Sequence, residues 1–255
     1  MANSARLDAA LSAAAAAAEI IRGSYQRNIE VRIKADRSPV TAADVAAEAA
    51  IRDVLQGRFP DDGFYGEESA AERMDAECLW LVDPIDGTKS FVRGYPMFST
   101  QIALMQHGCL ELGVSSAPVY GEIAWAERGQ GAWLDGARLA VSRIGRFEEA
   151  TISTGNLKAL AGGLRWAALG RIVTRLDRIR GFGDFLHYHL LAAGKIEAVI
   201  ESNIHILDIA ALTVIVKEAG GRVTDLEGAP ISLASTSILA SNGLLHQPIL
   251  EELRR

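Results

Sequence analysis

The chain has 255 residues, 49% of them hydrophobic and 23% charged, enough to bury a large core as one domain or two closely packed lobes. Its net charge of −6 and pI near 5.5 argue against a nucleic-acid partner held by a basic surface. The two cysteines, Cys78 and Cys109, fall outside any CxxC pair, which excludes a disulfide framework and fits a reducing cytoplasm.

An alanine-rich run from Ala9 to Ile21 raises the question of a signal peptide. Acidic residues bracket this run, and it contains one bulky apolar residue before Ile20, so we expect an N-terminal helix over residues 4–27 instead. No stretch of 18 apolar residues occurs, and we therefore expect no membrane span.

A polar link over residues 34–44 leads into a second expected helix, Ala42–Gln56, with Thr41 as its N-cap and Pro39 at the boundary. Asp44 then lies in the first helical turn. A carboxylate there interacts favourably with the helix dipole, so its presence needs no catalytic reason.

The stretch Leu79–Thr88 combines a short apolar run with two carboxylates. The apolar run is typical of a buried strand, and Pro84 should end that strand with Asp83 at its tip. Asp83, Asp86 and the carbonyl between them can converge on one point, which suits hard cations such as Mg²⁺ or Mn²⁺. Gly87 and Thr88 precede a short expected helix, 89–92, whose free N–H groups suit a phosphate. An Asp-Pro and Asp-Gly turn with solvated carboxylates is the plain alternative.

The middle of the chain favours an antiparallel meander, because short turns separate successive strands. Its expected strands are Ser99–Gln106, Cys109–Ala117, Glu122–Ala126 and Gly131–Leu134. After about Glu148, strands alternate with helices, which implies a partly parallel sheet covered on its faces. The expected strands there are 150–153, 177–181, 198–200 and 237–240, and the expected helices 159–169, 184–193, 206–219 and 244–255. We expect two lobes, 1–147 and 148–255.

Four acidic residues could meet in one site. Asp208 opens the helix 206–219, and with Glu67, Asp83 and Asp86 it would form a cluster, although an acid at the position of Glu67 is more commonly a solvated loop residue. If the four carboxylates converge, their mutual repulsion raises their pKa values unless bound cations offset the charge. A site of several carboxylates with bound cations, beside a phosphate-binding helix start, points to metal-assisted phosphoryl transfer to water.

His187 and His189 are weaker signals. They lie two apart on an expected helix and point away from each other, so they do not form a chelating pair. We expect them to be hydrogen-bonded residues at the surface or in an interface.

The motifs Gly66-Glu67-Glu68-Ser69, Trp80–Thr88, Asp208-Ile-Ala-Ala and Glu218-Ala-Gly-Gly221 together resemble the inositol monophosphatase family. The resemblance extends from about residue 34 to residue 242. It implies a layered αβαβα sandwich of mixed α+β and α/β character and a homodimer. The implied activity is Mg²⁺-dependent phosphate monoester hydrolysis, with Mn²⁺ possible.

The resemblance also implies roles for single residues. Glu67, Asp83 and the Ile85 carbonyl would bind one Mg²⁺. Asp83, Asp86 and Asp208 would bind a second, and Glu67 would help a third through water. The Gly87 and Thr88 N–H groups would hold the phosphate, and Asp44 with the Thr88 hydroxyl would orient the attacking water. One departure stands out: the family usually has Trp before the distal Asp, where this chain has Leu207.

The substrate is indicated by Gly183-Asp184-Phe185, which is similar to a run in the branch that hydrolyses histidinol phosphate. Glu201 matches the family position that contacts the distal groups of the substrate. The two carboxylates could pair with an ammonium or imidazolium group, although Asp184 could also cap the helix 185–193. The expected substrate contacts are Asp86, Gly87, Thr88, Asp184, Glu201 and Asp208.

We therefore expect an L-histidinol-phosphate phosphatase of histidine biosynthesis. Inositol 1-phosphate and other small phosphate monoesters are the alternative substrates. A regulatory binding protein on a phosphatase scaffold is disfavoured by the intact ligand set and the acidic charge.

Overall fold

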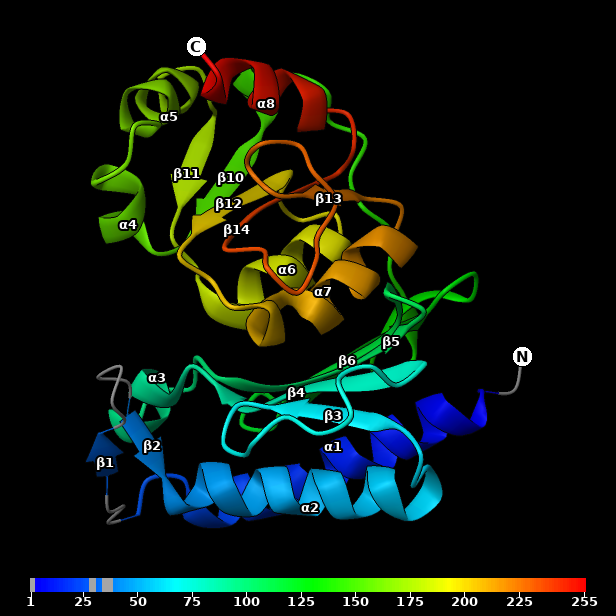
Figure 1. Cartoon of the computed structure of the whole chain (residues 1–255). Helices are drawn as coiled ribbons and strands as arrows, with labels where there is room; N and C mark the ends of the chain where they lie inside the picture. The colour runs from blue at the N-terminus through cyan, green and yellow to red at the C-terminus, as the bar shows by residue number, and fades with distance from the viewer. Residues whose placement is uncertain (1–2, 28–30, 34–38) are drawn as a thin grey trace.

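A computed structural model describes residues 3–27, 31–33 and 39–255 and arranges them in five layers, αβαβα, as the sequence predicted (Figure 1). The link expected at 34–44 lies partly outside the described residues. The helices are α1 (Ala5–Ser24), α2 (Ala42–Arg58), α3 (Thr88–Val92), α4 (Leu157–Ala161), α5 (Trp166–Val173), α6 (Asp184–Ala192), α7 (Ile206–Glu218) and α8 (His246–Leu253), with a 3₁₀ turn at Phe147–Glu149.

The outer helical layer at the N-terminal end consists of α1 and α2, shown in blue in Figure 1. Most alanines of α1 are buried, and such small side chains let the two helices approach closely. The predicted N-cap of α2 is confirmed, because the Thr41 hydroxyl accepts a hydrogen bond from the Ala43 N–H at 3.1 Å. Asp44 lies in the first turn of α2, also as predicted.

The next layer is a seven-stranded sheet in the order β3-β4-β5-β6-β7-β8-β9. Its strands are β3 (Gly63–Gly66), β4 (Cys78–Asp86), β5 (Ser99–Gln106), β6 (Cys109–Ala117), β7 (Glu122–Glu127), β8 (Gly131–Leu134) and β9 (Ala137–Arg138). The predicted antiparallel meander is confirmed for β5 to β8, and the structure extends it to β4 on one side and to β9, which was not expected, on the other. Strand β3 pairs with β4 in parallel and was missed as a strand.

The prediction that the central strand ends at Pro84 is wrong. Strand β4 continues to Asp86, with a shift of register against β5 between Asp83 and Asp86. Proline has no N–H to donate to the neighbouring strand, but the Pro84 carbonyl accepts a hydrogen bond from the side-chain hydroxyl of Thr100 in β5, at 2.8 Å. The irregularity therefore keeps the acidic end of β4 attached to the sheet.

Helices α6 and α7 form the middle layer, between the two sheets (Figure 1). The second sheet has the order β11-β10-β12-β14-β13 and is parallel from β11 through β12. Its strands are β10 (Thr151–Thr154), β11 (Arg178–Arg180), β12 (Ala198–Ser202), β13 (Arg222–Thr224) and β14 (Ser237–Ser241). A separate antiparallel pair, β1 (Val31–Ile33) and β2 (Pro39–Thr41), was not expected, and neither was β13.

Helices α4, α5 and α8 lie at the end of the molecule beyond the second sheet (Figure 1). The prediction of one helix over 159–169 is wrong, because two helices occupy this stretch and α4 ends before Gly162 and Gly163. Consecutive glycines favour such a break, since they lower helix propensity. The division into lobes 1–147 and 148–255 stays a prediction. None of the helices in the described ranges has both the length and the apolar composition needed to cross a bilayer.

Candidate active site

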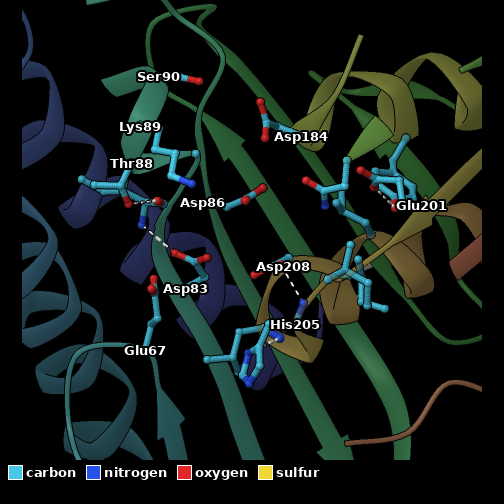
Figure 2. Close-up of a pocket in the computed structure, with 18 of the residues that line it drawn as sticks. Glu67, Asp83, Asp86, Thr88, Lys89, Ser90, Asp184, Glu201, His205 and Asp208 are labelled. Carbon is cyan, nitrogen blue, oxygen red and sulfur yellow. Dashed lines mark hydrogen bonds between the residues drawn. The ribbon is translucent and has the colours of Figure 1, made fainter. Parts of the chain in front are cut away.

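A cavity of about 860 Å³ lies where the end of β4, the start of α7 and the start of α6 meet. Figure 2 shows Glu67 and Asp83 on one side of it, Asp184 and Glu201 on the other, and Asp86 and Asp208 between them. The structure thus brings together acids that lie far apart in the sequence: Glu67 and Asp208 are separated by 141 residues.

Three aspartates form the centre of the site. Asp83, Asp86 and Asp208 each offer a carboxylate oxygen, and these oxygens lie within 4.8 Å of one another. Burial, together with the charges of the neighbouring acids, raises the pKa values of Asp83 and Asp86 well above their ordinary value. The pKa of Asp208 rises to about 7, again chiefly through burial. Like charges this close remain ionised together only when a cation offsets them.

Backbone N–H groups nearby in the sequence orient two of these aspartates through hydrogen bonds. The Ile85 N–H donates to Asp83 at 2.9 Å, which fixes this side chain within the irregular end of β4. The His205 N–H donates to Asp208 at 2.8 Å, as part of the cap of α7. Within the described residues nothing donates a hydrogen bond to the Asp86 carboxylate, although it faces the same space. All three therefore keep oxygens available for a ligand.

The fully buried Asp44 joins α2 to the start of α3. Its carboxylate accepts hydrogen bonds from the Thr41 N–H at 2.8 Å and from the Thr88 hydroxyl at 3.2 Å. The same hydroxyl lies 3.0 Å from the Ile85 carbonyl oxygen. Burial raises the pKa of Asp44 above its ordinary value. The expected position in the first helical turn and the pairing with Thr88 thus hold for one side chain at the same time.

Gly87 makes the sharp turn between β4 and α3. Its φ of +93° lies in the left-handed region, and a Cβ there would come within 2.5 Å of the Met97 carbonyl oxygen. Only glycine fits, and it brings the start of α3 to the edge of the cavity beside Asp86.

Glu67 lines the cavity on the loop that follows β3. A buried residue that the sequence analysis missed, Glu48 of α2, holds this loop by accepting a hydrogen bond from the Glu68 N–H at 2.7 Å. Gly66 leaves room for this contact, because a Cβ there would lie 2.5 Å from the Glu48 carboxylate. The charge of Glu67 also contributes to the raised pKa of Asp83.

The opposite wall carries Asp184 and Glu201. The alternative role of Asp184 as a helix cap is not observed, since Gly183 occupies the cap position and no side chain makes a capping hydrogen bond. Asp184 adopts a φ of +47°, and burial and the Glu201 charge raise its pKa to about 6. Burial would also raise the pKa of Glu201, but interactions with His187 and Tyr188 outweigh it and hold this pKa below its ordinary value.

We expected His187 and His189 to be hydrogen-bonded residues at the surface or in an interface. Both are hydrogen-bonded, but the surface location is wrong, because both are buried within the chain, His187 completely. They do point to different partners, as predicted: His187 contacts Glu201 at 3.1 Å, and His189 contacts the Ser115 hydroxyl at 2.9 Å. Two aromatic cavity residues, Tyr65 and Tyr188, were also missed, because no spacing in the sequence sets them apart from core residues.

A divalent cation fits the donor set of the three aspartates. Every donor is a carboxylate oxygen, which hard cations prefer, and the raised pKa values indicate negative charge that the described residues do not compensate. With the helix start at Thr88 beside it, such a cluster in a five-layer αβαβα fold defines a hydrolase of the phosphoric monoester class.

Comparison with known proteins identifies the family. The model of the inositol monophosphatase family matches residues 3–255, and the chain belongs to this family. A protein of Mycobacterium tuberculosis named histidinol-phosphatase is 40% identical over 232 residues, covering 89% of this chain and 88% of the relative. A Thermotoga maritima protein named fructose-1,6-bisphosphatase/inositol-1-monophosphatase is 38% identical, covering 83% of this chain and 81% of its own length.

A crystal structure of extragenic suppressor protein suhB from Bartonella henselae superposes with a TM-score of 0.92 at 33% identity. The match covers 99% of this chain and 99% of that chain. The predicted resemblance, the predicted fold and the prediction that the chain is a phosphatase are therefore confirmed.

Proposed function

We propose that this phosphatase acts preferentially on L-histidinol phosphate and thereby serves histidine biosynthesis. The observation that carries the proposal is the pair of carboxylates, Asp184 and Glu201, on the wall of the cavity opposite Asp83. A substrate that carries an ammonium or imidazolium group away from its phosphate gains from two carboxylates, whereas an uncharged polyol gains less.

We further propose that the ions are Mg²⁺, two or three per site, with Mn²⁺ able to replace them. Asp83, Asp86 and Asp208 would hold them, with Glu67 and the Ile85 carbonyl as further ligands. Bound there, Mg²⁺ would make a water molecule more acidic and offset charge on the phosphoryl oxygens.

The remaining roles belong to the chain itself. The Thr88 hydroxyl donates a hydrogen bond to the Asp44 carboxylate, so its oxygen can accept a hydrogen bond from the attacking water and orient it. As that water loses its proton to the Thr88 oxygen, the hydroxyl can pass its own proton to Asp44. The Gly87 and Thr88 N–H groups at the start of α3 suit the phosphate oxygens. No covalent phosphoenzyme is required, because water is the nucleophile.

The names of the relatives support the substrate in part. The Mycobacterium tuberculosis relative is named histidinol-phosphatase, which favours the proposal, while the Thermotoga maritima relative is named for other phosphate esters. An inositol 1-phosphatase with broad tolerance is therefore the second candidate. The homodimer and the cytoplasmic location stay predictions.

The test compares kcat/KM for L-histidinol phosphate and inositol 1-phosphate in the wild type and in Asp184→Asn. Asparagine tolerates the left-handed φ at this position, so the substitution removes charge and leaves the backbone conformation accessible. We expect a clear wild-type preference for histidinol phosphate, reduced about tenfold in the variant. A wild type that prefers inositol 1-phosphate would reject the substrate. Equal losses on both substrates would reject the role of Asp184.

A further inference from the structure

A chain of hydrogen bonds lies behind the wall that carries Glu201. The Phe182 N–H donates to the Ser153 hydroxyl oxygen at 3.1 Å, and this oxygen lies 3.2 Å from His187 Nδ1. The other ring nitrogen, Nε2, lies 3.1 Å from Oε2 of Glu201, which also accepts a hydrogen bond from the Tyr188 hydroxyl at 2.7 Å. Ser153, His187 and Tyr188 are withdrawn from water, while Glu201 and Tyr188 face the cavity.

The donors and acceptors in this chain of hydrogen bonds can be assigned. The Glu201 carboxylate has no proton to give, so Nε2 of His187 carries the proton in their contact and donates it to Glu201. When the ring carries only this proton, Nδ1 accepts from the Ser153 hydroxyl, whose oxygen accepts from the Phe182 N–H. The imidazole and the phenol thus orient the carboxylate through donated hydrogen bonds.

Gly155 packs against the other carboxylate oxygen of Glu201, Oε1. An alanine Cβ at this position would lie 1.6 Å from Oε1 of Glu201 and 2.5 Å from its carboxyl carbon. The φ of Gly155 is not in the left-handed region, so the backbone would accept another residue. The glycine is therefore needed for the space that the Glu201 carboxylate occupies.

We propose that His187 is a positioning residue, which with Ser153, Tyr188 and Gly155 fixes Glu201 as a charged receptor for the cationic part of the substrate. This inference rests on the proposed function, because it assumes a substrate with an ammonium or imidazolium group. The chain of hydrogen bonds begins at the backbone of Phe182, two residues before Asp184 in the sequence.

Burial alone does not give a histidine this role, and His246 offers the comparison. His246 is also fully buried and also contacts two hydroxyl groups, those of Ser241 at 2.9 Å and Thr224 at 3.0 Å. Its contacts end on these hydroxyls, and neither they nor His246 line the cavity. It therefore serves as a matched control for the loss of a buried imidazole.

The first experiment compares His187→Leu, His187→Gln and His246→Leu, with L-histidinol phosphate and inositol 1-phosphate as substrates. We expect His187→Leu to lower the ratio of the two kcat/KM values about tenfold, mainly through KM for histidinol phosphate. In His187→Gln the amide nitrogen can replace Nε2, so the ratio should return to within about threefold of wild type. The ratio should not change in His246→Leu.

Two milder variants keep the test decisive if His187→Leu does not fold. Tyr188→Phe removes one donor to Glu201 without changing shape, and Gly155→Ala displaces the carboxylate while leaving both donors in place. Each should lower the same ratio. In the wild type, ¹⁵N NMR of the imidazoles should show one buried ring protonated on Nε2 alone, and this signal should be absent from His187→Gln.

The outcomes separate this inference from the proposed function. A wild type that does not prefer histidinol phosphate rejects the substrate and this inference with it. If the wild type shows the preference but the ratio is unchanged in His187→Leu, Tyr188→Phe and Gly155→Ala, the positioning role alone is rejected. An imidazolium at His187, protonated on both nitrogens, would also reject it.

Discussion

Asp86 and Glu201 are both carboxylates of one cavity, yet their pKa values move in opposite directions. The pKa of Asp86 is raised well above the ordinary value by burial and by the charges of other acids. Burial acts on Glu201 as well, but His187 and Tyr188 overcome it and lower the pKa. Among the described residues, Glu201 has side-chain hydrogen-bond donors and the Asp86 carboxylate has none.

This difference indicates what each wall binds. A carboxylate with protein donors on one oxygen keeps its charge and its orientation, which suits contact with an organic cation. Carboxylates packed this closely are stable as anions only with an added cation, even where a backbone N–H donates to one of them, as at Asp83 and Asp208. The cluster of Asp83, Asp86 and Asp208 therefore suits ions from solution, whereas side-chain donors of the fold hold Glu201.

The largest expected effect comes from the cluster. Asp86→Asn should lower turnover by about 10³-fold, because a ligand of the cations is lost. In metal-free protein the same substitution should leave the melting temperature unchanged or raise it, since it removes a like charge. Steady-state kinetics and thermal unfolding check the two halves. Turnover within tenfold of wild type would contradict the ligand role.

A smaller effect is expected on stability as the pH changes. The folded pKa of Asp208, about 7, lies above its ordinary value of 3.8, so its contribution is present below about pH 4 and is lost as the pH rises through 7. Metal-free wild type should therefore lose about 2–4 kcal/mol relative to Asp208→Asn between pH 4 and pH 8. Urea unfolding of both proteins gives the difference.

Two controls accompany this measurement. The pKa of His246 is lowered to about 4, chiefly by burial, so His246 contributes in the opposite sense: its stabilisation is lost as the pH falls below 6.5. It is present in both proteins and cancels in the difference. Mg²⁺ should abolish the loss in the wild type, because the ion takes over the charge. A difference that does not vary with pH would show that Asp208 titrates normally.

The smallest of the three effects concerns the other wall. Glu201→Gln keeps the shape of the side chain and removes its charge, so KM for L-histidinol phosphate should rise about tenfold while kcat changes little. Mg²⁺ dependence should be unaffected, since Glu201 is not one of the clustered aspartates. A variant that loses kcat and Mg²⁺ response together would place Glu201 with the metal ligands and end the distinction between the walls.

Local patterns in the sequence predicted much of this molecule. The apolar run before Asp83, the Gly-Thr pair after Asp86 and the capped helix at Asp44 each occupy a few adjacent residues, and their local structure follows from those residues. The convergence of distant acids came from resemblance to the family, because no local rule brings Asp208 to Asp83.

The remainder depends on contacts between layers. Strand β3 is four residues long and is defined by its parallel neighbour, so its own pattern carries little signal. The role of His187 arises from the pairing of α6 with β12, and the same two-residue spacing would fit a surface helix equally well. Asp184 likewise does not cap its helix, because its backbone adopts a left-handed conformation that its residue type does not specify.

The most direct test of the whole account is phosphate release from L-histidinol phosphate by metal-stripped protein as Mg²⁺ is added back. We predict no turnover above background without the ion and a saturable return of activity with it, absent in Asp86→Asn. Undiminished turnover in excess chelator would contradict the claim that the clustered aspartates work by holding cations.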